Sequence, residues 1–323
     1  MAAPVVAVVI PYFQRQAGVL RRALASVAAQ QDPGGTVLVL VVDDESPAPA
    51  GPEVAAVTWP AGTQVRVIQR ANGGPGAARN TGMDAVDDGT PYIAFLDSDD
   101  EWSADHLARA VAVLKQGYDF YFADLLQLGA DVTAFLRARR ISPEDHQPLP
   151  APTQTHAYQG DFFDQTLSRN VVGTPTVVIA RDRLGKLRFR TEFTSAGEDY
   201  LFWMEAARAG AKVAFSTQCE VTCGRGVNVF AGAGWGTDGH LKRVHEEIAF
   251  KRHVVRHFAL TPPQAAAVRV HIENLRVSFW RDVLRRIRRR QSVSLALLRR
   301  HFAVDVTTLA GAPRYIWQIF RGS

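Results

Sequence analysis

The chain has 323 residues, of which 47% are hydrophobic and 21% charged, and its formal net charge is +5. This composition excludes a disordered chain and suits one large α/β domain with an appendage. Two cysteines are too few for a disulfide framework, and neither a leader segment nor an apolar run of membrane-spanning length is present, so we expect a cytoplasmic protein.

The first third of the chain alternates apolar runs with helical patterns. The runs predict strands at residues 5–10, 37–42, 65–69 and 92–96, and apolar spacing predicts a helix at residues 18–30. A Gly-rich stretch at residues 72–82 leads into another helix. Strand-helix-strand units of this kind form parallel sheets, so we expect ligands at the carboxyl ends of the strands.

The middle of the chain continues this pattern after one irregular stretch. A helix to about residue 116 and a strand near residues 120–126 precede residues 127–161, whose fold the pattern does not define. The pattern then predicts a strand at 176–180, a helix at 198–209 and a last strand at 211–215. From residue 239 the pattern is helical, which predicts a domain of residues 1–238 and a helical extension of residues 239–323.

Polar residues follow the second strand and the Gly-rich stretch. Asp44 stands at a strand end, where a carboxylate can bind a base or ribose or can instead stabilise a turn. Arg79 stands in the first turn of the helix after Gly73 and Gly74, and its rigid fork of donors suits a diphosphate. A Gly-rich turn has no ligand in most proteins, so both interpretations stay open.

A concentrated acidic segment follows the fourth strand. Asp97, Asp99, Asp100 and Glu101 repel one another unless a cation, an arginine or water screens them, and oxygen-only ligands suit Mg²⁺ or Mn²⁺. The alternative is a solvated acidic turn that caps the helix from Asp105. We favour the cation site because strand ends rarely carry so much charge.

A second acidic pair, Glu198 and Asp199, opens the helix at residues 198–209. The favourable interaction of carboxylates with a helix N-terminus explains such a pair without any function. A functional interpretation makes one of the two a general base. The local sequence alone favours the helix dipole.

Together these motifs, in this order, resemble glycosyltransferase family 2. The resemblance covers roughly residues 5–230 and is carried by five ordered stretches: Val8-Val9-Ile10-Pro11-Tyr12-Phe13, Val41-Val42-Asp43-Asp44-Glu45-Ser46, Asn72-Gly73-Gly74-Pro75-Gly76-Ala77-Ala78-Arg79-Asn80, Phe95-Leu96-Asp97-Ser98-Asp99-Asp100 and Gly197-Glu198-Asp199. It implies a GT-A fold, which is a Rossmann-like, mainly parallel mixed sheet flanked by helices. Residues 1–125 would then bind the nucleotide-sugar and residues 126–238 the acceptor.

The resemblance also implies a role for each matching residue. Asp97 and Asp99 would bind Mn²⁺ or Mg²⁺, and Asp199 would be the catalytic base of an inverting single displacement. The substrate-binding residues would be Pro11, Phe13, Arg15, Asp44, Arg79, Asp97, Ser98 and Glu198. Where many relatives carry a histidine after the last core strand, this chain has Arg225 and Asn228, which we expect to bind the substrate as the third metal contact or as a contact to the donor diphosphate.

Further stretches, among them residues 10–14, 18–27, 43–47 and 224–230, are similar to the succinoglycan-type exopolysaccharide β-1,3-glucosyltransferases. This resemblance implies transfer of glucose from UDP-glucose to a polyprenyl-diphosphate-linked oligosaccharide at the inner face of the cytoplasmic membrane. Alternatives are another UDP-sugar, such as galactose or N-acetylglucosamine, or a non-catalytic sugar-nucleotide-binding partner of a membrane assembly complex. No nucleic-acid partner is expected.

The C-terminal extension is strongly basic. Residues 276–300 contain nine arginines and one aspartate, and apolar residues such as Phe279, Trp280 and Val283 alternate with them. Such a helix can lie on an anionic membrane surface, or it can pack its apolar stripe against the catalytic domain. The apolar tail at residues 315–320 could pack in a core, bind a membrane or mediate a homodimer.

Overall fold

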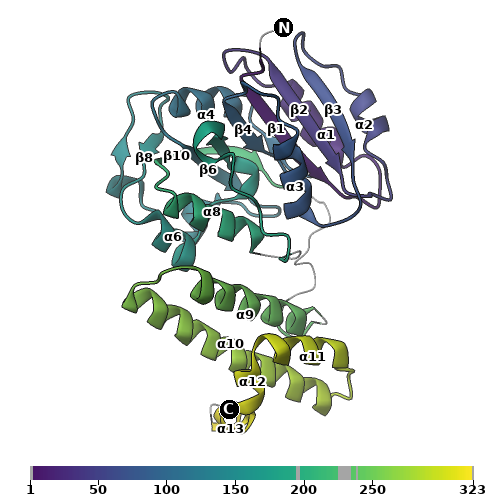
Figure 1. Cartoon of the computed structure of the whole chain (residues 1–323), viewed down its shortest axis with the longest axis vertical. Coiled ribbons are helices and arrows are strands. Elements are labelled where there is room, and N and C mark those ends of the chain that lie inside the picture. The colour runs from purple at the N-terminus through teal and green to yellow at the C-terminus, as the bar shows by residue number, and fades with distance from the viewer. Residues whose placement is uncertain (1–2, 194–196, 225–233, 238, 322–323) are drawn as a thin grey trace. The chain divides into compact units, whose positions relative to one another are not determined.

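The structure is a computed structural model that describes residues 3–193, 197–224, 234–237 and 239–321. The chain divides into an N-terminal unit, residues 1–194 and 198–227, and a helical unit, residues 195–197 and 228–323. Figure 1 shows a sheet flanked by helices in the first unit and helices in the second. The predicted domain boundary, residue 238, lies outside the described residues.

One mixed sheet forms the framework of the N-terminal unit. Its strands in the described residues lie in the order β3-β2-β1-β4-β9-β6-β10-β8-β7, and β5 also pairs with β10. The strands are β1 (Val6–Tyr12), β2 (Val37–Asp43), β3 (Gln64–Gln69), β4 (Tyr92–Phe95), β5 (Glu101–Trp102), β6 (Phe120–Leu126), β7 (Gln147–Pro148), β8 (Thr155–Ala157), β9 (Val178–Ala180) and β10 (Val213–Thr222).

The directions of the strands bring the predicted site to one edge of the sheet. Strands β3, β2, β1 and β4 are parallel, as are β6 and β10, whereas β9 is antiparallel to both β4 and β6. Tyr12 pairs in register with Asp43, so β1 and β2 end side by side. The carboxyl ends of parallel strands are where ligands bind in open α/β sheets.

Helices cover both faces of this sheet. Apolar residues of α1 and α4, such as Leu24 and Leu107, pack on one face, and those of α3 and α8, such as Met83 and Trp203, pack on the other. The helices are α1 (Leu20–Ala28), α2 (Gly51–Ala55), α3 (Pro75–Asp84), α4 (His106–Leu114), α5 (Ala134–Ala138), α6 (Phe162–Arg169), α7 (Arg181–Leu184) and α8 (Glu198–Arg208), with 3₁₀ turns at Pro143–Asp145 and Thr174–Thr176. The predicted α/β class is confirmed.

Strand β10 runs seven residues past the end predicted at Phe215. The sequence hides this extension because two register shifts, around Cys219, break the alternation of apolar and polar residues. Glu220 is fully buried there, where it binds His106 at 2.8 Å, Arg109 at 2.9 Å and Tyr121 at 2.7 Å. A strand with a buried carboxylate looks like a loop to any method that uses hydrophobic periodicity.

The helical unit contains α9 (His240–His257), α10 (Pro262–Arg288), α11 (Leu295–Val304), α12 (Val306–Ala310) and α13 (Ala312–Arg321). Phe279 and Val283 of α10 are buried against Leu241 and Ile248 of α9. These two residues of the predicted apolar stripe therefore pack inside their own unit, whereas Ile287 of the same stripe is 63% exposed. Across the described ranges, no helix is both long and apolar enough to cross a membrane.

Candidate active site

The loop after β1 ties together two other loops at the edge of the sheet. The backbone N–H of Gln14 donates to the Ser46 hydroxyl at 2.7 Å, and the Gln14 side chain donates to the Ser98 hydroxyl at 3.2 Å. Because Ser46 follows β2 and Ser98 follows β4, Gln14 fixes the spacing of three strand ends. The predicted loops therefore form one continuous edge.

Asp44 holds the Gly-rich loop. Its buried carboxylate accepts hydrogen bonds from the backbone N–H groups of Gly73 at 3.1 Å and Gly74 at 2.8 Å, and it pairs with Arg70. Gly74 has φ 84°, a conformation that favours glycine, and it precedes α3 directly. Asp44, predicted to bind the base, thus shapes the loop that leads to Arg79.

Arg79 is the centre of the charged cluster. It is 4% exposed and donates to Asp97 at 2.7 Å and to Glu198 at 3.1 Å, with its guanidinium 5.3 Å from the centre of the Phe189 ring. Burial alone would lower the pKa of Arg79, but the charges of Asp97 and Glu198 overcome this effect and raise it. Arg79 is a permanent cation that orients two carboxylates.

The acidic segment after β4 is a tight turn with one deeply buried member. The Asp100 N–H donates to the Asp97 carbonyl at 3.1 Å, and the Asp100 carboxylate accepts from the Gly224 N–H at 2.9 Å. Burial, and then the charges of Asp97 and Asp99, raises the pKa of Asp100 to about 8. Burial and the neighbouring negative charges together favour the protonated form of Asp100.

The end of β10 touches the acidic turn backbone to backbone. A Cβ atom added to Gly224 would lie 1.7 Å from the carbonyl oxygen of Asp99. No other residue fits at this position without movement of the turn. Gly224 therefore couples the last sheet strand to the position of Asp99.

Asp199 opens α8 beside the cluster around Arg79. Its carboxylate accepts from the Thr174 hydroxyl at 3.3 Å and from the Tyr200 N–H at 2.8 Å. Burial raises the pKa of Asp199, and the charge of Arg79 opposes this shift. Burial and the charge of Asp199 likewise raise the pKa of its neighbour Glu198 to about 7.

The residues at this edge fit a divalent cation. Asp97 and Asp99 supply hard oxygen ligands, and a positive charge beside them would offset the repulsion among the carboxylates of this turn. In the described part of the chain, no group of three His, Cys, Asp or Glu side chains could hold a metal ion. A cation held by Asp97 and Asp99 would therefore need further ligands, which substrate phosphates can supply.

The structure brings most of the predicted residues to this edge. Pro11 is buried in β1, Phe13 is partly exposed and Arg15 is exposed on the loop that follows. Ser98 is buried and bonded to Gln14. Arg225 and Asn228, predicted at the diphosphate, lie outside the described residues.

Four residues of the site were missed by the sequence analysis: Gln14, Thr174, Phe189 and Gly224. Gln14 lies within the stretch of residues 10–14 that carries the resemblance, so its position in the sequence could have identified it. Thr174 and Phe189 contact Asp199 and Arg79 only through the fold, so no local signal could have identified them.

A cavity of about 340 Å³ opens beside Asp99. Its lining also includes Val19, Arg22, Leu128, Cys223 and Gly224. The carboxylate that we predict as a metal ligand thus faces space for a small molecule or a sugar ring.

The comparisons with known proteins identify the class. The family model described as "Glycosyl transferase family 2" matches residues 7–172, and this chain belongs to that family. It is 31% identical over 316 residues to the succinoglycan biosynthesis protein ExoW of Rhizobium meliloti (strain 1021), covering 94% of this chain and 95% of that protein. The predicted family and the succinoglycan-type subgroup are confirmed.

Solved structures with the same fold support the GT-A architecture. The mannosyltransferase PcManGT from Pyrobaculum calidifontis, in complex with GDP-Man and Mn²⁺, matches with a TM-score of 0.56 and 16% identity over 99% of this chain and 83% of that chain. S. aureus TarS 1-349, in complex with UDP-GlcNAc, matches with a TM-score of 0.55 and 17% identity over 96% and 78% of the two chains. The predicted fold, a mixed and mainly parallel sheet with a C-terminal helical region, is confirmed.

Proposed function

We propose that this glycosyltransferase moves glucose from UDP-glucose, with inversion, to a hydroxyl of a lipid-linked oligosaccharide. The observation that carries the proposal is the cluster around Arg79. One guanidinium contacts Asp97 of the acidic turn and Glu198, the neighbour of Asp199. The predicted donor-phosphate site and the predicted base therefore belong to one charged cluster.

Each charged residue has a distinct task in this proposal. Asp97 and Asp99 would hold Mn²⁺ or Mg²⁺, which stabilises the charge on the leaving diphosphate when bound. Arg79 orients Asp97 and keeps the cluster from carrying excess negative charge. Glu198, with a pKa of about 7, can share a proton within the cluster.

Asp199 is the proposed general base. Its raised pKa makes the carboxylate a better proton acceptor than an ordinary aspartate, and the Thr174 hydroxyl fixes its orientation. Asp199 would take the proton of the acceptor hydroxyl as that oxygen attacks the anomeric carbon. A bond forms to the sugar while the bond to the diphosphate breaks on the opposite face.

The choice of substrates rests on the relatives. Similarity to ExoW over almost the whole chain supports an exopolysaccharide acceptor, and the TarS complex with UDP-GlcNAc supports a UDP-sugar donor. The mannosyltransferase complex with Mn²⁺ supports a divalent cation. Galactose or N-acetylglucosamine as the transferred sugar, and a non-catalytic binding role, remain the competing functions.

The acceptor's lipid would keep the enzyme at the inner membrane face. In the helical unit, exposed apolar side chains include Trp317 at 54% and Phe320 at 70% exposure, and both belong to α13. An interfacial helix needs such an apolar face with cationic neighbours, and Arg314 and Arg321 supply them. The same face could instead form a homodimer interface. Vesicle flotation tests the membrane contact, and sedimentation tests the homodimer.

A transfer assay with a panel of UDP-sugars, with and without Mn²⁺, tests the proposal. Asp99→Ala is expected to weaken donor binding and abolish the response to Mn²⁺, whereas Asp199→Asn is expected to keep donor binding and lose transfer. Glu205→Gln removes a carboxylate from the same helix as Asp199, paired with Arg190, and serves as the control with near-normal activity.

Four outcomes test these assignments. Preferred turnover of UDP-glucose supports the donor assignment, and preferred turnover of another sugar replaces it. Donor binding without any transfer by the wild type would favour the non-catalytic role. Full transfer by Asp199→Asn would remove the base from this mechanism.

A further inference from the structure

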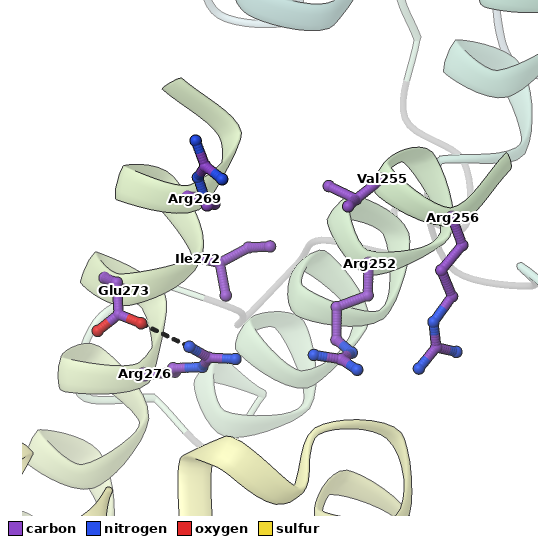
Figure 2. Close-up of a pocket in the computed structure, with 7 residues that line it drawn as sticks. All are labelled: Arg252, Val255, Arg256, Arg269, Ile272, Glu273 and Arg276. Atoms are coloured by element: carbon purple, nitrogen blue, oxygen red, sulfur yellow. Dashed lines mark hydrogen bonds and ion pairs between the residues drawn. The ribbon is translucent and has the colours of Figure 1, made fainter. Parts of the chain in front are cut away.

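A second charged site lies inside the helical unit, between α9 and α10. A cavity of about 400 Å³ is lined by four arginines, Arg252, Arg256, Arg269 and Arg276. Figure 2 shows the first two on one helix and the other two on the second. Arg252 and Arg256 are four residues apart and Arg269 and Arg276 are seven apart, or about one and two helical turns, so each pair lies on one helix face.

Only part of this charge is compensated. Asp305, which is fully buried, pairs with Arg252 at 2.9 Å and with Arg276 at 2.7 Å, and Glu273 pairs with Arg276 at 2.5 Å. Glu273 also pairs with Arg314 of α13. The four lining arginines and Arg314 share these two carboxylates, so positive charge is in excess around the cavity.

The two remaining arginines are available to a ligand. Arg256 and Arg269 are exposed, and no ion pair is found for either of them within the described ranges. Arg252 adds a buried Nε–H that has no hydrogen-bond partner in this part of the chain. Guanidinium forks match the oxygens of a phosphate group better than any other side chain does.

The walls between the arginines are apolar. Ile272 is 6% exposed and forms part of the wall, and Val255, which also lines the cavity, is 44% exposed. Helix α13 packs against α10, and Tyr315 donates to Glu273 at 3.1 Å, so the helix that carries Trp317 starts beside the cavity. A phosphate group attached to an apolar chain matches this combination of charge and surface.

We propose that this cavity binds the phosphate groups of a membrane lipid that carry about two negative charges, such as the diphosphate of a lipid-linked acceptor. The inference rests on the proposed function with a lipid-linked acceptor, and it assigns the diphosphate of that acceptor to the cavity between α9 and α10. The cavity would hold the phosphates between Arg256, Arg269 and Arg252 while the apolar chain runs along the exposed side chains of the helical unit.

Flotation of the full-length protein with neutral vesicles that contain polyprenyl diphosphate tests this proposal. The buffer contains EDTA and no donor, so neither a divalent cation nor catalysis contributes. We expect binding to these vesicles and not to neutral vesicles alone, and about tenfold or greater weakening in the double variant Arg256→Gln and Arg269→Gln. Both side chains are exposed, so the variant is expected to fold, which circular dichroism and thermal unfolding check.

A matched control separates this cavity from general surface charge. Arg281→Gln and Arg288→Gln remove the same charge from exposed positions of α10 outside the cavity and are expected to bind like the wild type. Equal loss in both double variants would overturn the proposal. Two further measurements use vesicles with an anionic phospholipid and free inorganic diphosphate. Vesicle binding that depends on Arg256 and Arg269 supports the proposed lipid-phosphate site. Equal affinity for free diphosphate overturns the proposal.

This outcome is independent of the transfer assay. A protein that transfers sugar but shows no dependence on Arg256 and Arg269 refutes only the lipid-phosphate site. A protein that binds the lipid through these residues but transfers no sugar retains the site and loses the proposed activity.

Discussion

Arg79 donates a hydrogen bond of 3.1 Å to Glu198, a residue 119 positions later in the chain. Both side chains are buried, Arg79 at 4% and Glu198 at 7% exposure. Both charges of a buried ion pair are removed from water. Replacement of one partner by an uncharged residue therefore leaves the other charge buried and uncompensated. This pair therefore connects the stability of the N-terminal unit to the geometry of its site.

Replacement of Arg79 is expected to be strongly destabilising. Arg79→Met should cost about 3–5 kcal/mol of unfolding free energy, because Glu198 and Asp97 lose their cation. Glu198→Gln should recover part of that loss in the double variant, with a coupling energy of about 1–3 kcal/mol. Urea unfolding of the four proteins measures this cycle, and strictly additive losses would contradict the pairing.

The hydroxyl of Thr174 should tune the pH dependence of transfer. Its hydrogen bond stabilises the charged form of Asp199 and so lowers a pKa that burial raises. Because the base must be deprotonated, activity is lost as the pH falls through this pKa. Thr174→Val is therefore expected to move the acid limb of the kcat/KM profile to higher pH, while Thr174→Ser keeps it. An unmoved limb in the valine variant argues against Asp199 as the titrating base.

Gly224→Ala should damage activity through the position of Asp99. The added methyl group would meet the Asp99 carbonyl at 1.7 Å, so either the strand end or the acidic turn must move. A displacement of this size at a catalytic site commonly costs about 100-fold in rate. Gly51→Ala is the control, because a Cβ there meets nothing within 4 Å and its φ is not positive. Steady-state kinetics and Mn²⁺ titration compare the two variants.

The helical unit should lose stability in mild acid because of His301. This ring stacks on Phe279 with centroids 4.0 Å apart, and its Nδ1 lies 3.2 Å from Nδ1 of His245. Burial, and then the charge of His245, lowers the pKa of His301 to about 4, with Asp305 and Arg276 acting in opposite directions.

The sign of this effect follows from proton uptake. Between the unfolded pKa near 6.5 and the folded pKa of about 4, the unfolded chain binds a proton that the folded chain excludes. Stability is therefore complete above pH 6.5 and falls toward pH 4, by up to about 3 kcal/mol. Thermal unfolding of His301→Gln should show a flatter pH dependence than wild type, whereas the exposed His257→Gln should not.

Local patterns were sufficient for the framework of this fold. Strands β1, β2 and β4 consist of almost continuous apolar residues, and the carboxylates that follow β2 and β4 stand where parallel strands end. Five motifs in a fixed order then identified the family. Asp97, Arg79 and Asp199 could be named because each belongs to one of these motifs.

Other features depend on contacts that no local pattern contains. The extension of β10 rests on Glu220, whose burial is compensated by His106 and Arg109 from another element. The local sequence left Asp44 open between a ligand contact and a turn, and the structure shows that its carboxylate binds the loop of Gly73 and Gly74. The arginine cavity could not be predicted from local sequence, because Arg256 and Arg269 belong to two helices that only the fold brings together.

The separation of Arg79 and Glu198 also sets the order of events during synthesis. A ribosome that adds about 5–20 residues per second needs on the order of 6–24 s to proceed from one to the other. For most of that interval the nascent chain carries Asp97 and Asp99 but lacks α8. A truncated transcript that ends before α8 would therefore yield a Rossmann-like half in which Arg79 has Asp97 but lacks Glu198. We expect cellular quality control to degrade such a fragment.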